Sequence, residues 1–306
     1  MKKIDVHLHL ANVIAGYGFR GESRSAGNGQ ITWANGDTYQ LLPEGFGEDK
    51  FLAEDALKIM DAHDVEKAVL MEGSMYGFQN RYYETLLKKY PERFAPACTV
   101  DPFMRGHLDN MHRFFEEVGF HIAKFEVSTG GGLMGANDPF LLDGPRFSEI
   151  AKVVNDNKGV LVLDLGDPTM DSHQILAVMR LADKNPDMKL VCCHLLAPQA
   201  EYHREWRAEL SILARENVYF DFSAVPNILD NSHGGAYPYP DTCRHVLEAV
   251  EILGEDRLMW GSDAPFAATR DSYEHLAEYL TEAEGFTPEL LQKLYYDNAQ
   301  HVYFER

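Results

Sequence analysis

The amino-acid sequence predicts an α/β protein whose parallel strands close into a (β/α)8 TIM barrel. Short apolar runs recur along the whole chain, and each is followed by a longer amphipathic stretch with the spacing of a surface helix. Strands that are apolar throughout and alternate with helices are typical of a parallel sheet covered on both faces. Eight such units favour a closed barrel over an open doubly wound sheet. A single barrel domain of 306 residues is an ordinary size.

The eight expected strands are the apolar runs at residues 4–8, 68–71, 94–100, 121–127, 160–165, 190–194, 218–222 and 258–260. Helices are expected at residues 49–63, 79–90, 107–118, 146–157, 172–184, 201–216, 241–253, 272–284 and 288–303. Several helix boundaries carry their own signals. Gly119 and Gly159 follow two helices at positions where a left-handed C-cap favours glycine.

One segment departs from this alternation. Residues 12–46 are rich in glycine and aromatic side chains, and a Thr/Gln alternation runs around residues 31–41. We predict an insertion after strand one, at about residues 11–48, that includes a small β-hairpin. Loops of this length usually serve function. A second glycine cluster at residues 129–132 predicts a flexible loop close to the active site.

The charge and cysteine content exclude several classes of protein. The chain has 48 acidic and 28 basic residues, a net charge of −20, so binding to nucleic acid or to an anionic membrane is disfavoured. No apolar stretch approaches the roughly 18 residues of a membrane-spanning helix. Asp5, His7 and His9 do not fit an export signal. Four cysteines without CxxC spacing indicate buried, reduced thiols. We therefore expect a cytoplasmic protein with a small-molecule substrate.

The first chemically informative motif is Asp5-Val6-His7-Leu8-His9, at the end of the first expected strand. Residues two apart on a strand share a face, so His7 and His9 are expected to project together while Val6 and Leu8 face the helices. Two imidazoles side by side at the C-terminal end of a strand form half of a zinc-type site. Their place directly before a long loop disfavours the alternative of two unrelated histidines.

Two further motifs end other strands. Trp260-Gly261-Ser262-Asp263 follows the last apolar run, and in a closed barrel strand eight lies beside strand one. Asp263 is therefore expected against His7 and His9, where it completes a facial set of metal ligands. On its own, Gly-Ser-Asp would indicate a turn or a helix cap. His194 closes the sixth run and is a candidate metal ligand, base or electrophile; a satisfied histidine at a strand end is the alternative.

Together these motifs resemble the amidohydrolase superfamily, in particular its amidohydrolase-2 branch of aromatic-acid decarboxylases and lactonases. The resemblance runs from His7 to about Asn298 and includes the insertion, the sequence GVLVLDLGDP of strand five and LMWGSDAPF of strand eight. It implies a divalent metal, zinc or alternatively manganese, bound by His7, His9 and Asp263. It also implies a catalytic or second-metal role for His194.

The chain departs from the family pattern at strand five, where Asp164 replaces the usual histidine ligand. An aspartate oxygen can replace an imidazole nitrogen on a metal, although it favours harder ions such as manganese. The alternative is a degenerate site in which Asp164 binds no metal. On strand four, Lys124 and Glu126 share a face. Family resemblance makes Glu126 a candidate to bridge a second ion with His194; alternatively, Lys124 pairs with Glu126 or Asp164. We expect a single ion.

Candidate substrate contacts follow the sixth strand. Guanidinium groups bind carboxylates through two parallel hydrogen bonds, so Arg204 and Arg207, with Trp206 between them, could clamp a substrate carboxylate. A solvated helix face is the alternative. Aromatic residues of the insertion either wall an apolar pocket or cover the barrel rim: Tyr17, Phe19 and Trp33.

The predicted function is hydrolysis of a small organic acid, ester, lactone or amide. Asp263 would act as the general base, and His194 would stabilise or protonate the developing oxyanion. One alternative is metal-dependent, non-oxidative decarboxylation of an aromatic or unsaturated acid. Another is a catalytically silent binding barrel, which only the replacement at Asp164 supports. Family resemblance also makes a homodimer an expectation.

Overall fold

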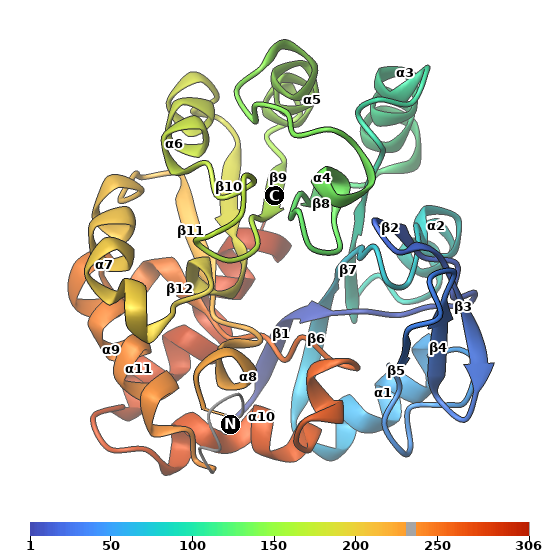
Figure 1. Ribbon diagram of the computed structural model, residues 1–306. Helices are drawn as coiled ribbons and strands as arrows, with labels where there is room; N and C mark the ends of the chain where they lie inside the picture. Colours follow the sequence, from blue (N-terminus) through green and yellow to red (C-terminus); the bar gives the residue numbers. More distant parts are fainter. Residues whose placement is uncertain (231–236, 306) are drawn as a thin grey trace.

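A computed structural model describes residues 1–230 and 237–305. Eight parallel strands form one sheet in which each strand pairs with the next along the chain (Figure 1). The strands are β1 (Lys3–Leu8), β6 (Val65–Leu70), β7 (Phe94–Cys98), β8 (Ile122–Glu126), β9 (Val160–Asp164), β10 (Lys189–Cys192), β11 (Val218–Asp221) and β12 (Leu258–Met259). The eight predicted strands are therefore confirmed, with small differences at their ends.

Backbone hydrogen bonds close the sheet into a barrel. The N–H of Val6 donates to the carbonyl of Trp260 at 3.2 Å, and the N–H of Asp263 donates to the carbonyl of His7 at 2.8 Å. Leu8 also forms a parallel bridge with Ala264. These contacts confirm the barrel, and they place the end of the last strand directly against the end of β1.

Most of the helices cover the outside of the barrel, while the short helix α4 (Leu133–Ala136) lies over its mouth (Figure 1). The helices are α1 (Ala53–Ala62), α2 (Asn80–Lys89), α3 (His107–His112), α4, α5 (Pro145–Asp156), α6 (Ile175–Lys184), α7 (His203–Ile212), α8 (Val225–Leu229), α9 (Pro240–Leu253), α10 (Tyr273–Glu282) and α11 (Pro288–Gln292). Within the described ranges, none of them is both long enough and apolar enough to cross a membrane.

The barrel interior is closed at the end where the strands begin. Alternate strand residues such as Val69, Ile122 and Val162 pack there against Val302 and Tyr303 of the last helical segment, Gln300–Phe304. The apolar filling excludes water from this end. Polar side chains inside the barrel therefore collect at the opposite end, at the C-terminal ends of the strands, as is usual for this fold.

The inward-facing residues of β1 differ from the prediction. Val6 packs in the barrel interior with Ile4, whereas Leu8 packs in the outer layer, so the expectation that both face the helices is wrong for Val6. The pairing explains this: three residue steps on β1, from Asp5 to Leu8, match two on β6, from Ala68 to Leu70. Such a bulge re-aims side chains. It turns His7 inward, although Asp5, two residues earlier, bonds to Tyr273 of α10.

The insertion after β1 forms a four-stranded antiparallel sheet, which is larger than the predicted hairpin. Its strands are β2 (Tyr17–Gly18), β3 (Gly21–Gly27), β4 (Gln30–Trp33) and β5 (Thr38–Gln40). Ile31 and Trp33 are buried against the main core, while Tyr17 and Phe19 remain exposed. One face of the small sheet is thus anchored, and its aromatic edge is left at the surface.

Candidate active site

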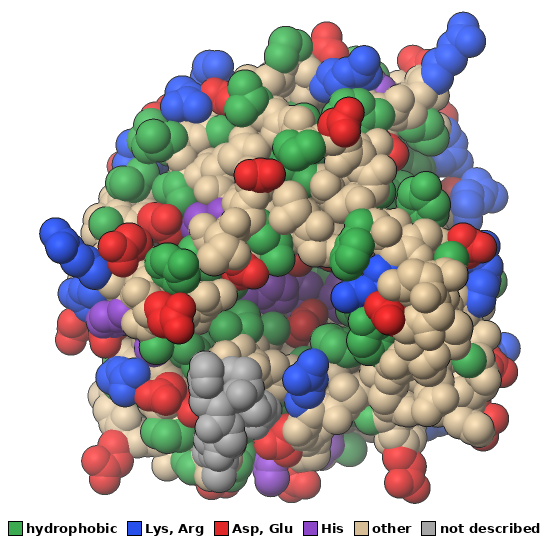
Figure 2. Space-filling model, viewed as in Figure 1, with side chains coloured by type: hydrophobic (Ala, Val, Ile, Leu, Met, Phe, Trp, Pro, Cys, Tyr) green, Lys and Arg blue, Asp and Glu red, His purple; other side chains and the backbone are tan. Residues whose placement is uncertain are grey.

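Histidine side chains lie at the bottom of a hollow on the face of the molecule shown in Figure 2. His7 lies near the end of β1, His9 directly follows this strand, and Asp263 lies in the loop after β12. His9 Nε2 lies 3.3 Å and His7 Nε2 3.5 Å from Asp263 Oδ1. One ligand atom from each of the three residues lies within 4.8 Å of the others. The structure thus brings together the three residues that the sequence predicts at this position.

Each imidazole of the site has its Nδ1 beside an oxygen. The partners are Asp221 Oδ2 at 3.2 Å for His7, the Met71 carbonyl at 3.0 Å for His9 and the Ser223 carbonyl at 3.0 Å for His194. Carbonyl and carboxylate oxygens only accept, so this network assigns the proton to Nδ1, which donates in all three cases. The Nε2 atoms of His7 and His9 are left facing Asp263 with their lone pairs.

Burial tunes the charges of this cluster. It lowers the pKa of His9 to about 4, in spite of the nearby Asp263 carboxylate, so this imidazole is neutral at neutral pH. The His9 ring also stacks on Tyr76, with ring centroids 4.7 Å apart. Burial alone would raise the pKa of Asp263, but the nearby His9, His194 and His7 side chains lower it. A neutral imidazole and an ionised carboxylate are the forms that bind metals.

The close approach of β1 to the last strand requires a glycine at position 261. A Cβ atom there would lie 2.9 Å from the Cβ of His7 and 3.1 Å from the Cβ of Ser223. The glycine of the Trp260-Gly261-Ser262-Asp263 motif therefore allows Asp263 to reach the histidines of β1.

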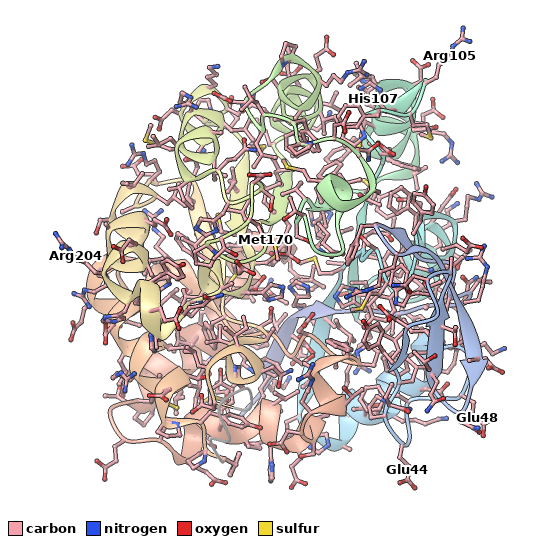
Figure 3. The ribbon with its side chains drawn as sticks, in the orientation of Figure 1. Glu44, Glu48, Arg105, His107, Met170 and Arg204 are labelled. Atoms are coloured by element: carbon pink, nitrogen blue, oxygen red, sulfur yellow. The ribbon has the colours of Figure 1, made fainter. Side chains whose placement is uncertain are left out.

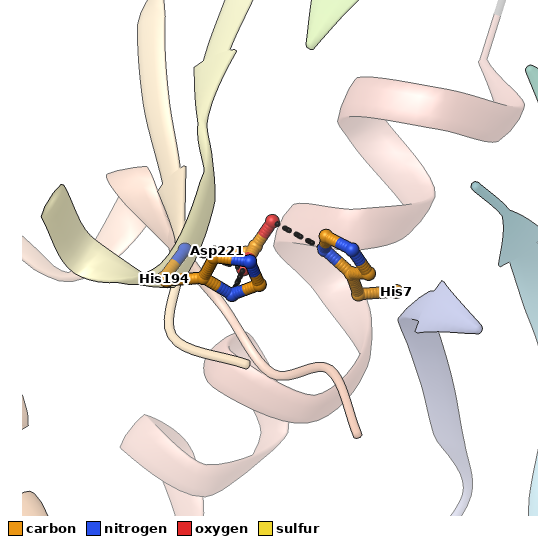
Figure 4. A group of neighbouring side chains, drawn as sticks. All are labelled: His7, His194 and Asp221. Atoms are coloured by element: carbon orange, nitrogen blue, oxygen red, sulfur yellow. Dashed lines mark hydrogen bonds and ion pairs between the residues drawn. The ribbon is translucent and has the colours of Figure 1, made fainter. Parts of the chain in front are cut away.

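Asp221, at the end of β11, is a site residue that the sequence reasoning missed. It is fully buried, and Figure 4 shows it between His7 and His194. Its Oδ1 accepts from the backbone N–H of His194 and from the N–H and hydroxyl of Ser223, while its Oδ2 faces His7. Both oxygens are therefore occupied, and Asp221 fixes the orientation of two imidazoles. A lone acid at the end of the apolar run 218–222 was the available signal.

His194 lies two residues beyond the end of β10 instead of closing the strand as predicted. Four successive residues from His194 to Ala197 have φ values between 50° and 63°, a left-handed turn. Such a conformation costs about 1–2 kcal/mol per non-glycine residue, so it must be held by its surroundings. The indole of Trp206 donates to the Leu195 carbonyl at 2.8 Å, and Asp221 accepts from the N–H of His194 at 3.0 Å.

His194 forms an ion pair with Asp164, at the end of β9. Their Nε2 and Oδ2 atoms lie 3.6 Å apart. Burial disfavours the charge on His194, but Asp164, together with Asp263 and Asp221, raises its pKa to about 10. Burial likewise disfavours the charge on Asp164, but His194 and Lys124 hold its pKa well below the ordinary carboxyl range. Both partners are therefore charged at neutral pH.

Glu126 and Lys124 lie on β8, at the other side of the mouth. Glu126 Oε2 accepts from the backbone N–H of Ser74 at 2.7 Å. Burial lowers the pKa of Lys124, but the surrounding Glu126, Asp164 and Asp263 carboxylates outweigh it and raise the value. Within the described residues, two groups of donors converge closely enough for a metal: His7 with His9 and Asp263, and His7 with His194 and Asp221. Glu126 and Asp164 belong to neither group.

The structure does not bring the predicted arginine clamp to the mouth. Arg204 lies on α7 and points away from the molecule in Figure 3. Arg207, also on α7, forms an ion pair with Glu248 of α9 at 2.6 Å. Trp206 is buried and supports the left-handed turn. A solvated helix face, the alternative reading, describes the two arginines.

Comparison with known structures supports the same fold. A probable 2-pyrone-4,6-dicarboxylic acid hydrolase from Acinetobacter baumannii, with citric acid bound, superposes with a TM-score of 0.70 at 16% identity and covers 100% of both chains. A putative 2-pyrone-4,6-dicarboxylic acid hydrolase from Pseudomonas putida gives 0.68 at 19% identity, covering 99% of this chain and 97% of the other. A 2,6-dihydroxybenzoate decarboxylase from Rhizobium gives 0.60 at 16% identity, covering 83% and 88%.

The sequence comparisons extend this from fold to family. No match was found among curated protein sequences. The sequence profile described as amidohydrolase, of the amidohydrolase-2 type, matches residues 4–304, which include every residue of the site described above. The chain therefore belongs to the amidohydrolase family, whose members include metal-dependent hydrolases and decarboxylases.

Proposed function

We propose that this protein is a metal-dependent hydrolase that acts on a small ester, lactone, amide or related organic acid. The observation that carries the proposal is the convergence of His7 Nε2, His9 Nε2 and a carboxylate oxygen of Asp263. Histidine ligands of catalytic metals usually donate their other ring nitrogen to a carboxylate or carbonyl, as His7 and His9 do here. The donors therefore fit a divalent ion, and two imidazoles with one carboxylate suit zinc, with manganese as the alternative.

In this proposal His7, His9 and Asp263 hold the ion. When bound, a divalent ion would supply Lewis acidity, acidifying water and polarising a substrate carbonyl. Asp263 would accept the proton of the attacking water, since its carboxylate lies at the open mouth of the barrel. His194, charged beside Asp164, would donate a hydrogen bond or its proton to the oxyanion that develops on the substrate.

The ligand roles of Asp164 and Glu126 remain sequence-based proposals, whereas His194 also belongs to a group of converging donors with His7 and Asp221. Asp164 and His194 would have to exchange their ion pair for a metal, and Glu126 would have to release the Ser74 N–H. Each exchange costs an existing interaction. We therefore propose a single ion held without them, and metal analysis of Asp164→Ala, His194→Ala and Glu126→Ala variants tests this.

The experiment is elemental metal analysis of purified protein, combined with assays on a panel of lactones and esters. We expect about one equivalent of zinc or manganese, lost in His7→Ala but retained in Asp164→Ala, and hydrolysis that stops when a chelator removes the ion. A well-folded protein that takes up no added zinc or manganese would overturn the proposal. Two equivalents, one of them lost in Glu126→Ala, would establish a two-metal site instead.

Non-oxidative decarboxylation is the second candidate. It is favoured by His194, whose raised pKa supplies a proton donor at the mouth that a departing carbon dioxide would require. Release of carbon dioxide from a panel of aromatic carboxylic acids, without hydrolysis of any ester or lactone, would establish this reaction. Metal uptake without either reaction would identify a binding barrel. We also propose a cytoplasmic location, supported by four cysteines that are all buried and free.

A further inference from the structure

The barrel mouth over β6, β7 and β8 contains a small polar cavity that the candidate metal centre does not use. Glu72 and Thr99 follow β6 and β7, Lys124 and Glu126 belong to β8, and all four line this cavity. The candidate metal ligands come instead from the end of β1 and from the loop after β12. The two sets are adjacent in one mouth, because the carbonyl of Met71, next to Glu72, accepts from His9.

Lys124 is buried without a direct partner. Its side chain is only 2% exposed. Among the residues that the structure describes, it donates no hydrogen bond and has no carboxylate within 4.0 Å. Removing a charge from water costs several kcal/mol, so buried ammonium groups are normally paired. Glu126, Asp164 and Asp263 lie near enough to raise the pKa of this ammonium group, but none of them forms a direct ion pair with it. A buried cation that lines a cavity and has no directly bonded partner can bind an anionic group that enters the cavity.

Glu72 supplies a second unsatisfied group in the same cavity. It is buried, and its Oε2 accepts from the backbone N–H of Gln79 at 2.8 Å. Its Oε1 has no hydrogen-bond partner within the described part of the chain. Burial raises the pKa of Glu72 to about 8, so at neutral pH this side chain is mainly a neutral acid. A neutral acid can donate a hydrogen bond to an anion and does not repel it.

The polar cavity continues into a larger, more apolar one. Ser74, Phe78 and Leu133 line both, and the outer cavity has a volume of about 300 Å³. Its wall includes Tyr17 of the insertion, and the rings of Tyr17 and Phe78 are 63% and 51% exposed. This volume is in the range of sites for small molecules. The aromatic side chains of the outer cavity therefore lie next to the polar cavity that Lys124 lines.

The polar cavity has a volume of about 10 Å³, which is room for a single oxygen atom. We propose that one oxygen of a substrate carboxylate enters this cavity with Lys124 as its counter-ion, and that the apolar body of the same molecule lies in the outer cavity against Phe78 and Tyr17. The proposal rests on the proposed function for the reacting end of the substrate, which would lie over the histidines of β1. The bound carboxylate is then a recognition group and is not the group that reacts. This arrangement favours hydrolysis over decarboxylation and makes Lys124 a specificity-determining residue.

The test is calorimetric binding of benzoate and of its uncharged analogue benzamide, to zinc-loaded and to chelator-stripped protein. We expect benzoate to bind at least tenfold more tightly than benzamide, with or without zinc, because a hydrogen-bonded ion pair supplies the difference. Lys124→Met should remove this preference and leave the zinc content unchanged. Lys124→Arg should retain part of it. Lys67→Met is the matched control, since Lys67 lies on β6 at the other end of the barrel and bonds Gln300.

Benzoate binding that is unchanged in Lys124→Met, or that disappears when zinc is stripped, would overturn the proposal. Zinc loss in Lys124→Met would also overturn it and assign Lys124 to the metal centre. If Lys124→Met does not fold, Phe78→Ala decides, because its half-exposed ring can be removed without opening the core. This variant should weaken benzoate severalfold and leave acetate unchanged; equal affinities for benzoate in both proteins would contradict the proposal. Failure of the proposed function alone would appear as absent zinc uptake with benzoate binding intact.

Discussion

The two parts of the barrel mouth differ in how completely their polar groups are satisfied. On the side of β1 and β9 to β12, each imidazole has its Nδ1 held by an oxygen, and Asp221 uses both of its oxygens. On the side of β6 to β8, Lys124 and one oxygen of Glu72 have no direct partner within the described residues. A satisfied network holds its members in fixed positions, whereas an unsatisfied one binds a further group. We infer that the first side holds the ion and the second binds substrate.

The largest expected effect on activity comes from replacing Asp263, the carboxylate of the proposed metal centre. Asp263→Asn removes both the proposed base and an anionic ligand, so kcat for the best ester or lactone substrate should fall by about 10²–10⁴-fold. Assays at saturating zinc separate the loss of the base from the loss of the ion. Asp230→Asn is the control at a second acid of the same barrel end, since Asp230 is buried but binds the start of α9 through Thr242. Activity of Asp263→Asn close to that of wild type would exclude Asp263 as the base.

A smaller effect is expected when the orientation of His7 is disturbed. In Asp221→Asn, the amide oxygen would keep the three donors at Oδ1, so the amide nitrogen would face His7 Nδ1. His7 would then change tautomer and lose its free Nε2 lone pair. Zinc affinity should fall by roughly 10–100-fold, as measured by competition with a fluorescent chelator. Unchanged affinity would show that His7 does not bind the ion through Nε2.

The proposed metal ligands were easier to predict from the sequence than the residues that hold them in position. His7, His9 and Asp263 follow from strand alternation and from barrel closure, which are regular. Asp221 is a single acidic residue in an apolar run, and it can be recognised as a site residue only once its hydrogen-bond partners are known. The left-handed turn at His194 could not be predicted, because Leu195, Leu196 and Ala197 have no preference for that conformation.

The outward position of Arg204 was available from the sequence, whereas the inward position of Val6 was not. Trp206 and Leu210, four residues apart, form the buried face of α7, and this spacing favours the solvated-face alternative for Arg204. The direction of Val6 depends on a bulge in the pairing of β1 with β6, which alternation alone does not reveal. The fold was therefore more predictable than the details of the site.

The pH dependence of stability tests the ion pair between His194 and Asp164. The pKa of His194 is raised from 6.5 to about 10 in the folded protein, so the stability from its pairing with Asp164 is complete below pH 6.5 and is lost as the pH rises toward 10. In metal-free protein, the Tm advantage of wild type over His194→Gln should shrink by on the order of 5 °C between pH 6 and pH 10. A constant difference would mean that His194 is neutral throughout.

The smallest effect is expected at the predicted arginine clamp. Arg204→Ala removes an exposed side chain on α7, so kcat/KM should change by less than about twofold and Tm should hardly change. The same assay applied to Lys124→Met should raise KM for carboxylated substrates by at least about tenfold. A large loss in Arg204→Ala would place the substrate carboxylate on the α7 side of the mouth and would contradict the division of the mouth.

The most direct test of that division is a crystal structure of the protein with zinc and benzoate, with data collected at the zinc absorption edge. We predict one anomalous peak among His7 Nε2, His9 Nε2 and Asp263, and a benzoate carboxylate within hydrogen-bond distance of Lys124 Nζ. A zinc peak between Glu126 and His194, or a benzoate carboxylate bound to zinc and away from Lys124, would contradict this account of the barrel mouth.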